Sequence, residues 1–222
     1  MFELFIPFFL LFLFILFLAI IWRINARKYI SSGTVASAYD AWTQDKLLER
    51  LWGEHIHLGF YPPGNKNIDF RKAKVQFVHE LVKWSDLDKL PKGSRILDVG
   101  CGIGGSSRIL AKYYGFNVTG ITISPAQVKR ARELTPSGLN CNFQVMDALN
   151  LEFDDGVFDA VWSVEAGAHM NDKTRFADEM LRTLRPGGYL AMADWNSRDL
   201  KACPPSFFEK LVLKQLLEQW VH

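Results

Sequence analysis

The sequence has few cysteines and lacks any long run of basic residues. Its 222 residues include only three cysteines, Cys101, Cys141 and Cys203. They are far apart and odd in number, which excludes a disulfide framework and fits a reducing compartment. Their spacing is also unlike that of a metal site. The formal net charge is only +2, and no Lys/Arg run is interleaved with aromatics, so nucleic acid is not an expected partner.

Long apolar runs are absent too, except at the N-terminus. Leu4–Trp22 is apolar throughout and is followed by Arg23, Arg27 and Lys28. A helix of this length matches a hydrocarbon core about 30 Å thick. A cleaved secretory signal is the alternative. It is disfavoured because Glu3 stands where such a signal carries positive charge, and because no small-residue cleavage site follows the run.

Residues 1–30 are therefore predicted to be an uncleaved membrane anchor that enters the lipid bilayer through residues 4–22. Positive charge flanking a span favours the cytoplasmic side. The N-terminus is thus expected outside, and the remainder of the chain is expected in the cytoplasm.

Residues 31–90 are predicted to form a helical lid or cap. Helical periodicity extends over Val35–Leu51 and again over Ala73–Trp84. Between them lie the stretch Trp52–Tyr61 and a loop at residues 62–67, which is marked by its Pro, Gly and Asn content.

Residues 91–222 alternate between short apolar runs and amphipathic helical patterns. This alternation predicts an α/β domain with a parallel, doubly wound sheet. The expected strands are at 95–99, 117–122, 142–145, 157–163 and 189–194. The expected helices are at 106–114, 124–134, 172–184 and 205–220, the third of them stopped by Arg185–Gly188.

A turn crowded with glycines joins the first strand to its helix. Gly100-x-Gly-x-x-Gly105 satisfies the dinucleotide fingerprint, so an NAD-dependent oxidoreductase is one hypothesis. That hypothesis requires an acidic residue about 20 positions further on, to hold a ribose hydroxyl. Thr122 stands there instead. Because a side chain at Gly100, Gly102 or Gly104 would crowd an approaching ligand, these glycines are predicted to border a binding site.

An acidic residue precedes the glycine turn within the strand. Asp98-x-Gly-x-Gly-x-Gly104 resembles motif I of class I S-adenosylmethionine (SAM) methyltransferases. Asp147-Ala148, Phe158–Ser163 and Leu184–Leu190 resemble later blocks of that superfamily, in the same order. The resemblance implies a Rossmann-like class I methyltransferase fold with SAM as cofactor.

Two longer stretches narrow the resemblance. Ser163–Lys173 and Trp52–Tyr61, together with Thr122 and Gln127, resemble the 2-methyl-6-phytyl-1,4-benzoquinol methyltransferase and tocopherol methyltransferase family. This implies C-methylation of a prenylated quinol in tocopherol (vitamin E) or plastoquinone biosynthesis, at a plasma or thylakoid membrane. γ-Tocopherol methyltransferase is the runner-up. A soluble amine or sterol methyltransferase is less favoured, because the predicted anchor suits an acceptor with an isoprenoid tail.

Members of that family continue well beyond the final predicted helix, whereas this sequence ends at His222. The last strands of the sheet are therefore expected to be missing, and the methyltransferase domain at 91–222 is expected to be incomplete. A truncated pseudoenzyme that binds SAM without transferring a methyl group is accordingly a further hypothesis.

The resemblance also implies a set of cofactor-binding residues. Tyr39 is expected to fold its aromatic face over the cofactor, with a core tyrosine as the alternative, and Cys101 is expected to be a small filler rather than a nucleophile. The implied cofactor residues are Tyr39, Asp98, Gly100, Cys101, Gly102, Gly104, Thr122, Gln127, Asp147 and Ala148.

A general base is expected, because a quinol ring carbon becomes more nucleophilic when an adjacent hydroxyl loses its proton. His169, with Glu165 close by, follows the fourth strand and is the catalytic candidate; an ordinary helix-start histidine is the alternative. Trp52, His55 and His57 are expected in a lid over the acceptor, with ordinary surface histidines as the alternative. No metal is expected at His55 and His57, since two residues that are two positions apart do not share a helix face.

Overall fold

The structure is a computed structural model that describes residues 11–18, 32–64, 67–196, 202–210 and 212. Contacts divide the chain into two units, one of residues 1–30 with 199–222 and one of residues 31–198. In the first unit, residues 11–18 are helical, as are 207–210 and 212. The second unit contains the sheet and its helices.

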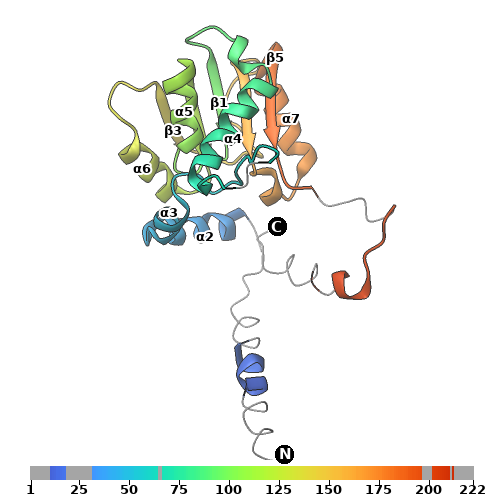
Figure 1. Cartoon of the computed structure of the whole chain (residues 1–222). Helices are drawn as coiled ribbons and strands as arrows, with labels where there is room; N and C mark the ends of the chain where they lie inside the picture. The colour runs from blue at the N-terminus through green and yellow to red at the C-terminus, as the bar shows by residue number, and fades with distance from the viewer. Residues whose placement is uncertain (1–10, 19–31, 65–66, 197–201, 211, 213–222) are drawn as a thin grey trace, which may run out of the picture. The chain divides into compact units, whose positions relative to one another are not determined.

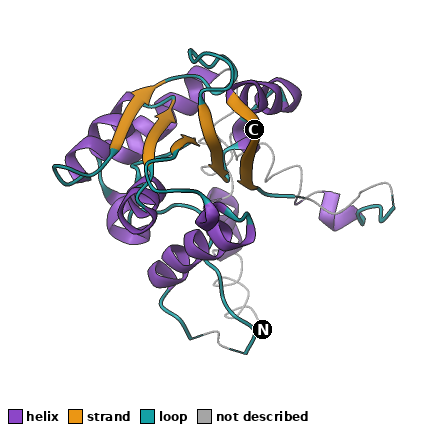
Figure 2. Cartoon of the chain, turned by 90° about the horizontal axis from the view of Figure 1, so that it is seen from above, coloured by secondary structure: helices purple, strands orange, loops and turns teal. Residues whose placement is uncertain are grey.

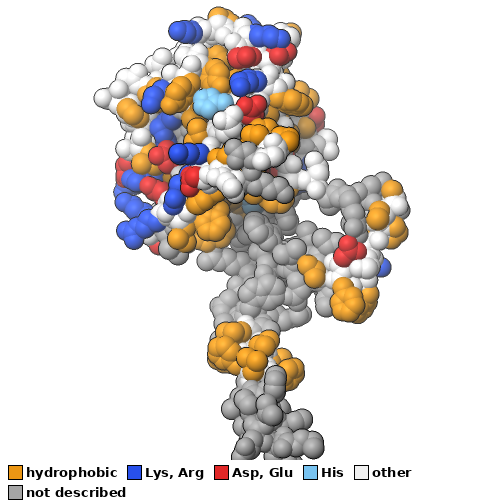
Figure 3. Space-filling model, viewed as in Figure 1, with side chains coloured by type: hydrophobic (Ala, Val, Ile, Leu, Met, Phe, Trp, Pro, Cys, Tyr) orange, Lys and Arg blue, Asp and Glu red, His pale blue; other side chains and the backbone are white. Residues whose placement is uncertain are grey.

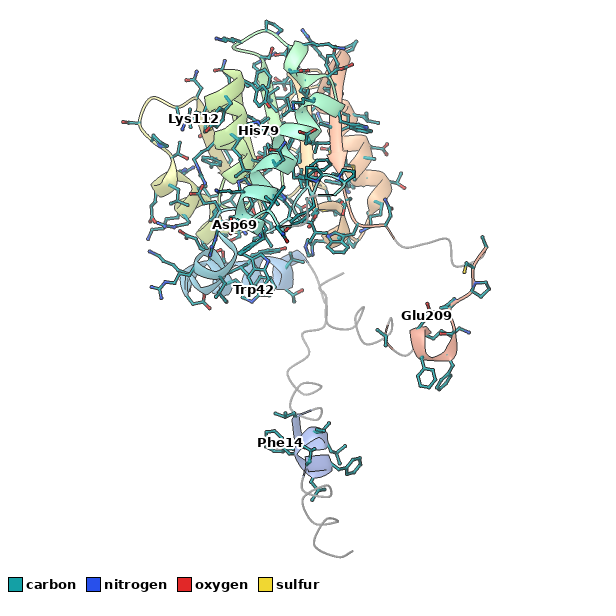
Figure 4. The ribbon with its side chains drawn as sticks, viewed as in Figure 1. Phe14, Trp42, Asp69, His79, Lys112 and Glu209 are labelled. Carbon is teal, nitrogen blue, oxygen red and sulfur yellow. The ribbon has the colours of Figure 1, made fainter. Side chains whose placement is uncertain are left out.

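The predicted membrane span Leu4–Trp22 lies largely outside the described residues, and so does the predicted helix at 205–220. Among the residues that the structure describes, no helix is long and apolar enough to cross a membrane. The helical residues 11–18 are all apolar and exposed; Phe14 is one of them (Figure 4). The anchor stays a prediction.

The second unit is built on a five-stranded parallel sheet (Figure 1). In spatial order its strands are β3 (Cys141–Val145), β2 (Asn117–Thr122), β1 (Arg95–Val99), β4 (Phe158–Val164) and β5 (Leu184–Ala193). β1 pairs with β2 on one side and with β4 on the other. The chain order reverses at β1, so a ligand is expected outside the carboxyl ends of β1 and its neighbours. The predicted parallel α/β sheet is confirmed.

Helices cover both faces of this sheet (Figure 2). α4 and α5 pack on one face, over a core that includes Ile96 and Trp162, whereas α7 packs on the other, over Leu97 and Val161. Alternate residues of β1 and β4 therefore enter opposite layers, as in strands buried on both faces. The helices are α2 (Ser32–Gln44), α3 (Leu47–Trp52), α4 (Phe70–Trp84), α5 (Gly105–Tyr114), α6 (Pro125–Leu134) and α7 (Lys173–Thr183), with 3₁₀ turns η1 (Leu87–Lys89) and η2 (Gly167–His169).

Side-chain caps fix where three of these helices begin. Asp69, Ser124 and Asp172 accept hydrogen bonds from backbone N–H groups in the first turns of α4, α6 and α7; Asp69 is labelled in Figure 4. Such caps satisfy donors that the helix itself leaves unpaired. Ser124 followed by Pro125 is the helix start that the sequence predicts, and the structure confirms it.

The single helical pattern predicted over 35–51 is two helices in the structure. α2 ends at Gln44 and α3 begins at Leu47. Lys46, between them, has a φ of 55°. This left-handed conformation cannot continue a right-handed helix, so the chain changes direction there.

β5 begins earlier than the strand predicted from Tyr189. It starts at Leu184, directly after α7. Phe158 pairs with Leu184 while Ala160 pairs with Tyr189, so the intervening Arg185–Gly188 forms an irregular bulge opposite β4. α7 ends at Thr183, just before these residues, as predicted, whereas the strand starts five residues earlier than predicted because the bulge belongs to β5.

Charged side chains are mixed on the face of the molecule drawn in Figure 3. Lys and Arg are interspersed there with acidic and apolar side chains. A surface that binds a nucleic-acid backbone would gather basic side chains into one patch or stripe. This face has no such patch among the described residues.

Candidate cofactor site at the carboxyl end of the sheet

The turn Gly100–Gly104 follows β1 and is held to β2 by its backbone. The N–H groups of Gly100 and Cys101 both donate to the carbonyl oxygen of Ile121, at 2.9 Å. Gly100, Gly102 and Gly104 have φ angles of 79°, 54° and 81°. Residues that have a Cβ rarely adopt such angles. The turn therefore favours glycine for its own conformation, before any ligand is considered.

Side chains added at the three glycines would meet different surroundings. A Cβ at Gly100 would lie 2.5 Å from Cβ of Ala166, and one at Gly104 would lie 2.6 Å from Cζ of Phe143. At Gly102 the nearest atom would be Nε2 of Gln127, at 4.0 Å. Packing within the protein thus gives Gly100 and Gly104 a reason of their own to be glycine, and contact of the three glycines with a cofactor stays a prediction. Gly102 is the one with an open face.

Asp98 lies beneath the turn and is almost fully buried, with 2% of its surface exposed. Its carboxylate accepts a hydrogen bond from Oγ of Ser107 at 2.5 Å, which ties β1 to α5. Burial raises the pKa of Asp98 to about 6, against the opposing effect of the Ser107 hydrogen bonds. The structure thus gives Asp98 a partner within the protein, and its contact with a cofactor stays a prediction.

The end of β2 carries a network of buried polar side chains. Thr122 Oγ1 donates to Gln127 Oε1 at 2.6 Å and accepts from the Ser124 N–H at 3.3 Å. Ser124 Oγ accepts from the Gln127 N–H at 3.1 Å. The network fixes the direction of the Gln127 amide, whose Nε2 is the atom nearest to the open face of Gly102. Two predicted cofactor residues, Thr122 and Gln127, are thereby brought beside the glycine turn.

Asp147 and Ala148 follow β3 at the same edge of the sheet. Met146 donates its N–H to Thr122 O at 3.0 Å, which aligns the ends of β2 and β3. Asp147 Oδ1 accepts from the N–H of Leu149 at 2.9 Å, and Ala148 is buried. A hollow of about 360 Å³ is lined by Asp147, Leu149, Asn150, Asn171, Asp172 and Arg175.

The two cysteines of this region are not poised as nucleophiles. Burial raises the pKa of the Cys101 thiol well above its usual range and that of Cys141 to about 12. The thiolate is the reactive form of cysteine. Both side chains are therefore thiols at neutral pH, and Cys101 has the filler role that the sequence predicts.

α2 lies across the carboxyl ends of the strands. Its Tyr39 hydroxyl is 2.9 Å from Nε2 of His169, in η2 after β4, and the two rings meet edge to face. The neighbouring Asp40 reaches α6, after β2. The structure thus brings Tyr39 and His169 together, although the sequence predicted one for the cofactor and the other for catalysis.

Glu165 directly follows β4 and has a left-handed conformation, with a φ of 52°. Its Oε1 accepts from the N–H of Leu58 at 3.0 Å. A non-glycine residue persists in that conformation only where its surroundings enforce it. In the structure, Glu165 holds the Trp52–Tyr61 segment against β4, which is a role in positioning; a role as the base stays a prediction.

His55 and His57 are buried and do not form the exposed rim of a lid. His57 Nδ1 donates to Leu58 O at 2.7 Å, so its Nε2 accepts from His55 Nδ1 at 3.1 Å. The His57 ring packs on Phe77 of α4, and His55 lies against Gly105. Of the three predicted lid residues, only Trp52 is exposed.

Three cations fasten this segment and the end of α3 that precedes it, and none of them is among the predicted site residues. Arg108 pairs with Glu54 at 2.6 Å. Lys74 donates to the carbonyls of Trp52 and His55, at 3.3 and 2.7 Å, and Arg71 donates to two carbonyls of α3. Lys74 could have been found, because a lysine four positions before Val78 shares the apolar face of α4. Burial lowers its pKa to about 8.

Comparisons with known proteins identify the fold. Residues 97–192 match the family model of a methyltransferase domain. The chain is 60% identical over 204 residues to the 2-methyl-6-phytyl-1,4-hydroquinone methyltransferase of Synechocystis sp., a match that covers 91% of this chain and 64% of the relative. Over most of its length the chain is thus similar to methyltransferases.

Two further matches extend the similarity to other proteins. It is 41% identical over 166 residues to the chloroplastic tocopherol O-methyltransferase of Arabidopsis thaliana, covering 70% of this chain and 48% of the relative. The solved structure of the [4+2]-cyclase SpnF is 29% identical with a TM-score of 0.67, covering 77% of this chain and 62% of that one. The chain thus spans less than two thirds of the length of these relatives. The cyclase shows that the fold alone does not set the reaction.

Metal ligands are not gathered in the part of the chain that the structure describes. No group of three or more His, Cys, Asp or Glu side chains there could hold a metal ion. His55 and His57, the two histidines of the Trp52–Tyr61 segment, bond to each other.

Proposed function

We propose that this chain transfers a methyl group from SAM to a ring carbon of a prenylated benzoquinol of the 2-methyl-6-phytyl-1,4 type, in the biosynthesis of tocopherol or plastoquinone. One observation carries the proposal: identity is 60% to the hydroquinone methyltransferase and 41% to the tocopherol O-methyltransferase. There are two alternatives: methylation of γ-tocopherol, and a truncated pseudoenzyme that binds SAM without transferring a methyl group.

The residues at the carboxyl end of the sheet fit SAM. The open face at Gly102 admits a ligand to the backbone, and the fixed Gln127 amide stands beside it. Thr122 takes the place of the acidic residue that would hold the ribose of NAD. Asp98 ties β1 to α5 through Ser107, and Gly100 and Gly104 let the turn pack closely against Ala166 and Phe143. When bound, SAM supplies a methyl group on a sulfonium.

Alignment and exclusion of water are the main tasks of the protein in such a displacement. α2 performs both, because Tyr39 and Asp40 hold it over the ends of β4 and β2. His169 is the proposed base that takes the proton of the quinol hydroxyl, and Glu165 holds the segment that closes the other side.

The anchor belongs to the same proposal. Leu4–Trp22 would hold the chain in the membrane where a prenylated acceptor dissolves, with the catalytic unit on the cytoplasmic side of a plasma or thylakoid membrane. Such a placement brings an acceptor with a long apolar tail to the enzyme without extraction into water.

The test is transfer of labelled methyl from SAM by the full chain in lipid vesicles that contain either 2-methyl-6-phytyl-benzoquinol or γ-tocopherol. We expect label in the benzoquinol product only. Label in tocopherol alone would favour the alternative, and SAM binding without transfer to either would favour the pseudoenzyme. Calorimetry with SAM, its demethylated product and NAD is the companion measurement, in which binding of NAD alone would overturn the proposal.

A further inference from the structure

Two adjacent residues of α2 contact opposite sides of the glycine turn. Tyr39 bonds to His169, which follows β4. Asp40 bonds to Ser124 and Ala126, which follow β2. Because β2 and β4 are the two neighbours of β1 in the sheet, these bonds make α2 cross the end of β1.

A single oxygen of Asp40 accepts both of its bonds. Oδ1 accepts from Oγ of Ser124 at 2.5 Å and from the N–H of Ala126 at 3.0 Å. The Ala126 N–H belongs to the first turn of α6, where the helix leaves N–H groups unpaired and favours negative charge. Asp40 is therefore a second cap for α6, supplied by a residue 84 positions away from Ser124.

Asp40 also begins a chain of hydrogen bonds that ends at the cofactor site. Ser124 donates to Asp40 and accepts from the Gln127 N–H. Gln127 in turn accepts from Thr122, beside the open face of Gly102. Ser124 is fully buried, so water cannot replace Asp40 as the acceptor of its hydroxyl without opening the site.

We propose that Asp40 is a positioning residue. It fixes Ser124, and through Ser124 the side chains of Thr122 and Gln127, in the geometry that binds the cofactor while α2 is closed over β1. The inference rests on the proposed function in one respect, namely that the cofactor is SAM. It adds a link between α2 and the cofactor site, made by the hydrogen bonds of Asp40.

The test compares Asp40→Ala and Asp40→Asn with Gln44→Ala, an exposed position on the same helix, all in the full chain in detergent. The amide oxygen of Asn can accept both bonds, whereas Ala accepts neither. We expect Asp40→Ala to weaken SAM binding by about tenfold, as for a lost hydrogen bond of about 1.4 kcal/mol, and Asp40→Asn and Gln44→Ala to stay within about threefold of the parent. Calorimetry gives the affinities.

Hydrogen exchange provides a second measurement that needs no ligand. Asp40→Ala should speed exchange over residues 33–44 and at Ala126, while exchange in the central strands is unchanged. Unchanged exchange in Asp40→Ala overturns the proposal, whether or not the parent binds SAM. Equal loss of SAM affinity in Asp40→Ala and Asp40→Asn overturns it as well, because the accepting oxygen would not then be what matters. A parent chain that binds no SAM refutes the proposed function alone, and the exchange result then decides on Asp40.

A double-mutant cycle separates the hydrogen-bond chain from a general loss of stability. Ser124→Ala breaks the same chain one step further on. We expect the double variant Asp40→Ala/Ser124→Ala to bind SAM no more weakly than the weaker of the two single variants, within about threefold, since residues in one network are not additive. Fully additive losses would show that the two residues act separately, which contradicts the proposal.

Discussion

The hydroxyl of Tyr39 lies 2.9 Å from Nε2 of His169 and joins α2 to the 3₁₀ turn η2 that follows β4. Burial, together with the negative charge of Glu165, raises the pKa of Tyr39 to about 12. Tyr39 therefore stays protonated at neutral pH, as a donor that can orient the imidazole. The hydroxyl and the ring of Tyr39 thus have separable roles.

Tyr39→Phe removes the hydroxyl and keeps the ring. We expect kcat to fall about three- to tenfold, the usual effect of one neutral hydrogen bond, with SAM affinity little changed. His169→Ala should lower kcat by at least about a hundredfold if His169 is the base. Steady-state kinetics with the benzoquinol acceptor gives both values. Equal loss in the two variants would contradict a role for Tyr39 in orientation only.

Stability should depend on pH through His55. Burial, and then the neighbouring His57, lowers the pKa of His55 to about 3, whereas an unfolded histidine titrates near about 6.5. Between these values the unfolded state binds the additional proton, so this contribution is present above about pH 6.5 and is lost as the pH falls toward about 3.

Asp98, whose pKa is raised to about 6, makes the unfolding free energy change with pH in the opposite direction between about pH 4 and 6. Comparing the parent with His55→Gln cancels the Asp98 contribution, because both proteins contain it. The difference in unfolding free energy between parent and variant should change by up to about 1.4 kcal/mol per pH unit within the window. Urea denaturation at pH 4.5, 5.5 and 7.5 measures it. A difference independent of pH would mean that His55 is not held neutral.

Arg108 should matter more than the carboxylate with which it pairs. Its guanidinium donates to Ile103 O at 2.8 Å as well as to Glu54, and its side chain is 10% exposed against 50% for that of Glu54. Arg108→Met should lower the unfolding free energy by about 1–3 kcal/mol, the cost of leaving a buried acceptor unpaired. Glu54→Gln should cost less than about 1 kcal/mol, as for a surface ion pair. Thermal unfolding ranks the two variants, and a larger loss for Glu54→Gln contradicts the argument.

The parts of the fold that local patterns specify were predictable from the sequence. The strand–turn–helix at Arg95–Tyr114 and the cap at Ser124 depend on apolar periodicity, glycine and capping residues, which act over a few positions. The helix end before Arg185–Gly188 was predicted, but the bulge that these residues form in β5 was not, because Pro and Gly are typical of both features. Only pairing with β4, which is distant in sequence, distinguishes the two outcomes.

The contacts that assemble the site were not predictable from those patterns. Asp40 and Ser124 are 84 positions apart, and Tyr39 and His169 are 130 apart. Nothing local in an amphipathic helix shows that two neighbouring residues bridge two strand ends. The burial of His55 was missed for the same reason, since the face that an irregular segment presents depends on the helices against which it packs.

The glycine turn gives the sharpest distinction between packing and binding. Gly100→Ala places a Cβ 2.5 Å from Cβ of Ala166, whereas Gly102→Ala places one in open space, 4.0 Å from Gln127. Both variants bear the cost of a positive φ, which is about 1–2 kcal/mol. Only the first adds a steric clash, so Gly100→Ala should lower the melting temperature clearly more than Gly102→Ala. Gly102→Ala should instead weaken SAM binding by at least about tenfold, since about 1.4 kcal/mol is a modest cost for crowding a bound ligand. Thermal unfolding with and without SAM tests both: a Gly102→Ala variant that SAM stabilises as strongly as the parent would show that the open face is not where the cofactor lies.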